Sequence, residues 1–122
     1  MASRRLNVAR QRKGVLAQAV LHSAQVAFRN RAALAEWLGI ERSQITRAAA
    51  GQSIGGAAGW RMKGLAAVVT ALLDVYDPEV VPDWLAGINP HLNDRRPLDV
   101  LAQGDVASVM AALQAEQAGS FA

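Results

Sequence analysis

The sequence contains no cysteine, which excludes disulfide bonds and metal sites built on thiolates. It also lacks any run of about 18 uninterrupted apolar residues, so we predict no membrane-spanning helix. The basic start of the chain is not followed by an apolar stretch and cleavage site of the signal-peptide type. These absences favour a cytoplasmic location.

Aromatic residues are scarce, at 5% of 122 residues, and no segment has the alternating pattern of a half-buried strand. Alanine is abundant and 52% of the residues are hydrophobic, which is enough for a core built from helices. We therefore predict an all-α fold without strands.

Charge is divided unevenly along the chain. Residues 1–63 contain eleven Lys or Arg against two acidic residues, a balance of +9, whereas residues 64–122 contain two against eight, a balance of −6. This asymmetry predicts a polyanionic partner for the first half and a different partner for the second. The alternative is that the charges only keep both halves soluble.

Apolar periodicity and capping residues predict a series of helices. The first runs from about residue 15 to 28, and further helices are expected at 31–38, 42–50 and 60–76, followed by short helices up to the C-terminal end. Residues 51–59, GQSIGGAAG, have no phosphate-loop spacing and are predicted to be a linker or turn. The apolar residues expected on the inner face of the first helix are Leu16, Val20, Ala24, Ala27 and Phe28; those expected on one broad face of residues 60–76 are Leu65, Val68, Val69, Leu72, Leu73 and Tyr76.

Residues 34–51, LAEWLGIERSQITRAAAG, have the spacing of a helix-turn-helix. Ala35 is small enough for a close helix crossing, Gly39 suits the turn, and Ile45 fills the core from the second helix. This framework resembles the helix-turn-helix of Xre-type repressors. An ordinary antiparallel helix pair with a solvated polar face is the alternative.

The outward positions of the second helix suit DNA. Arg42 or Arg47 is expected to pair with guanine, Gln44 with adenine, and Ser43 and Thr46 with phosphate or base. Contacts to the DNA backbone are expected from Arg31, together with Arg29, Arg61 and Lys63. The basic segment SRRLNVARQRK, residues 3–13, is either an arm that contacts the minor groove or phosphates, or a disordered tail.

The last forty residues carry a second pattern. Its elements are Trp84-Leu85, Asn89-Pro90, Leu92, Arg96-Pro97-Leu98-Asp99, Leu101, Gly104, Val109, Leu113 and Gly119-x-Phe121-Ala122. In order and spacing the segment resembles the C-terminal domain of the MbcA/ParS/Xre antitoxins, which neutralise RES-domain toxins. Asp94 departs from the pattern, because glycine or another small residue is expected there.

The resemblance implies an antitoxin of a type II toxin–antitoxin system. In that family the C-terminal end blocks the NAD site of an NAD-consuming toxin, and the complex represses its own operon. The positions that it implies for toxin contact are Trp84, Asn89, Arg95, Arg96, Gly119, Ser120, Phe121 and Ala122.

Some of these residues could instead serve the fold of the chain itself. Trp84 is suited to a core, and Arg95 and Arg96 either pair with local acids such as Asp94 and Asp99 or meet a carboxylate on a partner. An apolar chain end such as Phe121 suits a partner's pocket better than water.

Nothing in the sequence indicates catalysis. His22 and His91 lie far apart in the chain without a matching carboxylate motif, and no metal-ligand cluster is present, so we expect neither an enzyme nor a cofactor. We expect three regions: a basic arm and helix-turn-helix in 1–59, a connecting or dimerisation helix in 60–76, and a toxin-binding domain in 77–122. A cognate toxin, operator DNA and a second copy are the expected partners. The alternatives are a stand-alone repressor whose C-terminal half dimerises, and an adaptor that binds only proteins.

Overall fold

The computed structural model describes residues 2–119, with side chains from residue 8 onward. Within these residues there is no strand, and the all-α prediction is confirmed. None of the described helices is both long and apolar enough to cross a membrane. The elements are α1 (Ala2–Gln25), α2 (Arg31–Leu38), α3 (Arg42–Ala49), α4 (Gly56–Leu73), η1 (Pro78–Val80), α5 (Val81–Ala86), η2 (Pro90–Leu92), α6 (Pro97–Ala102) and α7 (Val106–Gly119).

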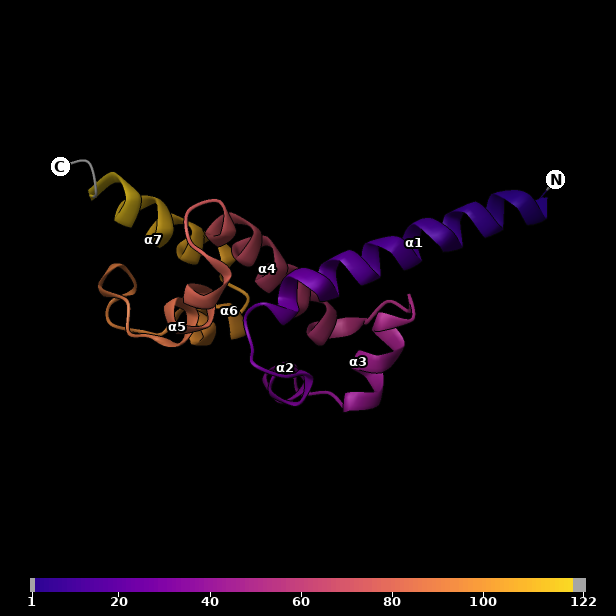
Figure 1. Cartoon of the computed structure of the whole chain (residues 1–122), viewed down its shortest axis with the longest axis horizontal. Coiled ribbons are helices and arrows are strands. Elements are labelled where there is room, and N and C mark those ends of the chain that lie inside the picture. Colours follow the sequence, from indigo (N-terminus) through magenta and orange to yellow (C-terminus); the bar gives the residue numbers. More distant parts are fainter. Residues whose placement is uncertain (1, 120–122) are drawn as a thin grey trace.

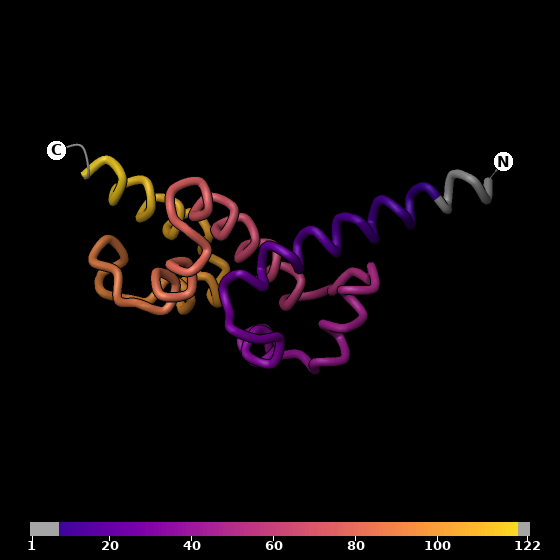
Figure 2. Tube along the Cα trace, viewed as in Figure 1, coloured from indigo at the N-terminus to yellow at the C-terminus, as the bar shows by residue number. Residues whose placement is uncertain are grey.

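The helix α4 joins two groups of helices. Figure 1 shows α2 and α3 beneath one end of α4, and α5, α6 and α7 around its other end. The first part of α1 extends away from this body, as the trace in Figure 2 also shows. One hydrogen bond connects the groups directly, because Trp37 Nε1 of α2 donates to the Leu98 carbonyl oxygen of α6 at 3.3 Å. A second ties α4 to α6, because Arg61 Nε donates to the Ala102 carbonyl oxygen at 3.1 Å.

The N-terminal basic segment is part of α1, which begins at Ala2 and not near Val15. An extended or disordered backbone for residues 3–13 is therefore wrong, whereas contact of this segment with DNA stays a prediction. The sequence MASRRLNVARQRK contains no proline or glycine, and Arg, Gln, Lys and Ala have high helix propensity. Apolar periodicity could not reveal this part of α1, because residues 8–13 are all exposed and need no apolar face.

The face of α1 that packs inward also differs in part from the prediction. Ala17, Leu21 and Ala24 are buried, whereas Leu16 is 64% exposed. Val20 and Phe28 are half-buried against the core. The buried face of α1 is thus centred on Ala17, Leu21 and Ala24, and, contrary to the prediction, it does not include Leu16.

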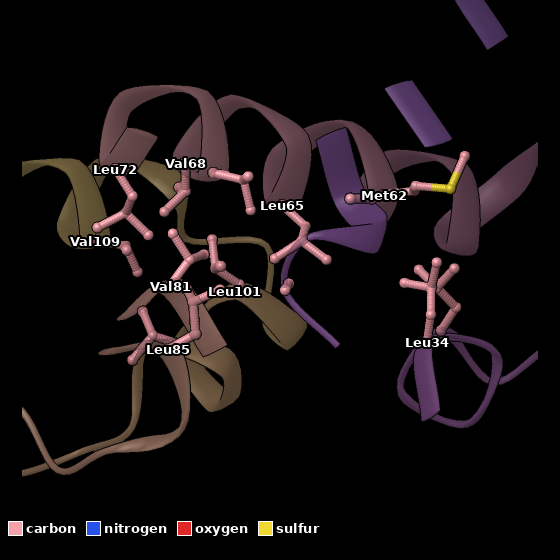
Figure 3. Packing of buried hydrophobic residues seen from close by; sticks show 14 of the residues in the cluster. Leu34, Met62, Leu65, Val68, Leu72, Val81, Leu85, Leu101 and Val109 are labelled. Atoms are coloured by element: carbon pink, nitrogen blue, oxygen red, sulfur yellow. The ribbon is translucent and has the colours of Figure 1, made fainter. Parts of the chain in front are cut away.

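A single hydrophobic core extends through both groups of helices (Figure 3). Leu65, Val68, Val69 and Leu72 of α4 have no exposed surface. Figure 3 shows Leu34 near one end of this row and side chains of α5, α6 and α7 near the other. The chain covers these four side chains with its own helices, so they are not free to form a dimer contact, and a dimerisation role for residues 60–76 stays a prediction.

The predicted linker 51–59 is shorter than expected, because α4 begins at Gly56. A turn of α4 rests directly on the preceding loop: a Cβ atom added at Gly59 would lie 2.1 Å from the carbonyl oxygen of Ile54. This contact excludes any side chain at residue 59. Gly59 thus permits close packing rather than flexibility.

Candidate nucleic-acid and partner sites

The helices α2 and α3 are joined by a short turn, and the local signals predicted for this pair are present. Asn30 caps α2 by accepting a 2.8 Å hydrogen bond from the backbone of Ala33. Gly39 ends α2 with φ 72°, the left-handed conformation that glycine adopts without strain. Ala35 is 3% exposed and Ile45 is fully buried, as the spacing predicts. The turn therefore fixes α3 across α2.

The polar residues of α3 lie on its free surface. Arg42, Ser43, Thr46 and Arg47 are all exposed, and no salt bridge between described residues involves either arginine. The helix is short, so all four lie within about two turns of its N-terminus. This is the arrangement in which a recognition helix presents side chains to base edges in the major groove.

Two of the side chains predicted to contact DNA instead form hydrogen bonds to the backbone of α3 or of its N-cap residue. Gln44 is half-buried, and its side-chain oxygen accepts a 3.2 Å hydrogen bond from the backbone of Glu41, which forms a capping box with the Glu41 carboxylate. The Thr46 hydroxyl donates to the Arg42 carbonyl oxygen at 3.3 Å. In this conformation Gln44 helps to begin the helix, so Arg42 and Arg47 are the residues of α3 best placed to reach bases.

The predicted phosphate contacts divide into two groups. Arg29 and Arg31 are exposed beside the start of α2, and Lys63 lies 5.3 Å from the centre of the Trp60 ring on the exposed side of α4. Arg61, by contrast, uses its Nε to bind the end of α6. Arg61 thus helps to hold α4 against α6, a role that its position in the sequence does not reveal.

Two further residues beside α3 were not predicted from the sequence. Gln18 of α1 donates from Nε2 to the Ala49 carbonyl oxygen at 3.1 Å, so it holds the end of α3. Ser53 in the following turn shares a hollow of about 170 Å³ with Gln44 and Arg47. No sequence motif identifies either residue, because only the folded chain brings them beside α3.

In the C-terminal half, Asn89 organises the loop between α5 and α6. Its side chain is 7% exposed and accepts a 2.9 Å hydrogen bond from the backbone of His91. Its backbone pairs with that of Arg95 in an isolated antiparallel bridge. Between them, Asn93 and Asp94 have φ values of 56° and 61°, so both residues adopt the left-handed conformation that favours glycine.

Trp84 and Tyr76 are both anchored on α7 by Glu116. Trp84 Nε1 donates to Glu116 Oε2 at 2.8 Å, and the Tyr76 hydroxyl donates to Glu116 Oε1. Trp84 is half-buried and shares a surface hollow of about 330 Å³ with Ile88, Asn89 and Glu116. Because Ile88 is 71% exposed beside it, this hollow has an apolar rim.

The remaining predicted partner residues are more scattered. Arg96 pairs with Asp99 at 3.0 Å, one of the two alternatives considered for it, and Arg95 Nε donates to the Leu92 carbonyl oxygen at 3.0 Å. Gly119 is the last residue of α7. Ser120, Phe121 and Ala122 lie outside the described residues.

We expect Tyr76 to titrate above 10.0. Its hydrogen bond to Glu116 raises the pKa of the hydroxyl, and burial and the nearby negative charge add to the rise. The folded pKa exceeds the unfolded one, so the stabilisation is complete below the unfolded pKa and is lost as pH rises through the folded pKa. Tyr76 is the only tyrosine, so phenolate absorbance reports it alone. Glu116→Gln should lower the midpoint toward 10.0; equal midpoints in both proteins would contradict this assignment.

The described residues contain no group of three or more His, Cys, Asp or Glu that could hold a metal ion. His22 lies exposed on α1 and His91 exposed in η2, on separate parts of the fold. Asp105 caps the last helix, and hydrogen bonds from Ser108 lower the pKa of its carboxyl. Among residues 8–119, most of the candidate contact residues lie on two surfaces. One surrounds α3, and the other surrounds the loop at Asn89.

No protein-family model, curated protein or solved structure matches this chain.

Proposed function

We propose that this protein is an antitoxin that binds operator DNA through α3 and neutralises an NAD-consuming RES-domain toxin through its C-terminal half. The observation that carries the DNA-binding part is the exposed surface of α3. Arg42, Ser43, Thr46 and Arg47 lie there together, behind a turn that is fixed by Gly39 and a buried Ile45. A helix so presented fits the major groove, and its two arginines match guanine.

Charge supports this division of roles. The balance of +9 in residues 1–63 favours a polyanion near α3, and the balance of −6 in residues 64–122 disfavours DNA at the other end. The partner of the acidic half is therefore expected to be a protein.

The toxin-binding part depends on the resemblance of the C-terminal segment, which implies that the chain end occludes the toxin's NAD site. The apolar rim at Ile88 and the hollow beside Trp84 offer a surface for a protein partner near α7. Glu116 of α7 accepts hydrogen bonds from both Trp84 and Tyr76. These contacts hold in place the helix that directly precedes the end of the chain.

A truncation tests the toxin-binding part. The protein encoded beside this chain should co-purify with it, and its consumption of NAD should be suppressed by the full chain but not by a version that ends at Ala118. That version retains Glu116, so its fold should be unchanged. Phe121→Ala in the full chain is the control for length, and we expect it to relieve suppression in part.

If nothing co-purifies and NAD is untouched, the toxin-binding part is wrong, and a stand-alone repressor becomes the better description. Loss of DNA binding is not expected in either version, because α3 is unchanged.

A further inference from the structure

The turn that follows α3 is surrounded by cations from three helices. Arg47 of α3 lines one hollow with Ser53 and Ile54. Lys13 of α1 and Lys63 of α4 line a second hollow, of about 300 Å³, that has the same two residues in its wall. The one salt bridge among the described residues joins Arg96 to Asp99, so no carboxylate within them neutralises these three cations.

The position of Lys13 beside this turn is fixed by close backbone contact. A Cβ atom at Gly51 would lie 3.3 Å from the Cα of Gly14, the residue that follows Lys13. One turn further along α1, Gln18 is hydrogen-bonded to the end of α3 at 3.1 Å. The register between α1 and α3 is thus set at two points, and Lys13 is held beside the loop.

The basic side chains of α1 point in different directions around the helix axis. A rotation of about 100° per residue places Arg10 within about 60° of Lys13, on the side of α1 that faces the body. The same rotation places Arg12 about 100° from Lys13 and about 160° from Arg10, toward solvent. All three are exposed, so they differ in direction and not in burial.

We propose that Lys13, Lys63 and the Ser53 hydroxyl form a phosphate-binding site that holds the DNA backbone beside α3, with Arg10 directed at a neighbouring phosphate. This inference rests on the proposed binding of DNA by α3. Surface cations with no acidic partner, together with a hydroxyl donor, are the groups that bind phosphate oxygens. Arg47 lines the neighbouring hollow, which shares Ser53 and Ile54 with this one, so the site adjoins the surface of α3.

The salt dependence of DNA binding tests this site. Each lost phosphate contact should reduce the magnitude of the negative slope of log K against log salt concentration by about 0.9, so Lys13→Gln and Lys63→Gln together should reduce it by nearly two. The loss of affinity should be equal for a duplex from upstream of the gene and for an unrelated duplex, because phosphates carry no sequence information. Arg12→Gln, which removes the same charge from the neighbouring residue, should leave the slope unchanged.

The outcomes separate the two proposals. If the unaltered protein binds neither duplex, the proposed DNA binding fails, and this site fails with it. If Arg42→Ala with Arg47→Ala abolishes discrimination between the duplexes but the double lysine variant keeps the original slope, the phosphate site alone is overturned. If Arg12→Gln changes the slope as much per removed charge as the two lysine substitutions do, the phosphate site is also overturned. The effect would then depend on net charge and not on position. Unchanged circular dichroism is expected for all these variants because each altered side chain is exposed.

Discussion

Replacing both Arg42 and Arg47 by alanine is expected to weaken binding of the upstream duplex at least about 30-fold, because each arginine paired with guanine contributes about 1–3 kcal/mol. Both side chains are exposed, so the fold should persist. Competition with an unrelated duplex measures how much of the loss is sequence-specific. The double variant should retain the weaker, salt-sensitive binding that phosphate contacts provide.

Arg95→Ala with Arg96→Ala is the matched control for this experiment. It removes the same charge from the segment just before α6, and Figure 1 shows α6 on the other side of the molecule from α3. There Arg95 donates to the Leu92 carbonyl oxygen and Arg96 pairs with Asp99. DNA affinity should change by less than about threefold in this control. Equal losses in the two double variants would show that net charge, and not the surface of α3, determines affinity.

A second large effect is expected in the core, where Leu65→Ala should lower the free energy of unfolding by about 2–5 kcal/mol. Leu65 has no exposed surface and lies within the cluster that connects α2 to α5, α6 and α7. Denaturant unfolding should remain a single transition in the variant, because both groups of helices share this cluster.

Leu73→Ala on the same helix provides the comparison. Leu73 is 38% exposed, so its removal should cost less than half as much as removal of Leu65. Two separate transitions in the Leu65 variant, with only one shifted, would contradict a shared core.

The bounds of α2 and α3 could be predicted closely from the sequence because local chemistry determines them. Gly39 and Ile45 have roles that depend on neighbours within a few residues, and the structure places both as expected. The face of α1 was harder to predict. Leu16 and Ala17 both begin apolar series at helical spacing, and in an alanine-rich helix periodicity alone cannot choose between them.

The contacts that organise the C-terminal half could not be predicted in the same way. Tyr76 and Trp84 meet Glu116 across separations of 40 and 32 residues, and nothing local distinguishes that glutamate from the chain's other acids. The cations around Ser53 come together only because α1 packs on α3 and α4. The surface of α3 could therefore be predicted from local spacing, whereas the residues that hold it in place could not.

The most direct test of the central claim is a titration of the ¹⁵N-labelled full chain, which has a mass of 12.9 kDa, with the upstream duplex by NMR. We predict that the largest amide shifts occur at residues 42–47 and in the turn 51–55, with no comparable change in residues 77–119. Shifts confined to residues 77–119, or none at DNA concentrations that saturate other helix-turn-helix proteins, would contradict binding of DNA by α3.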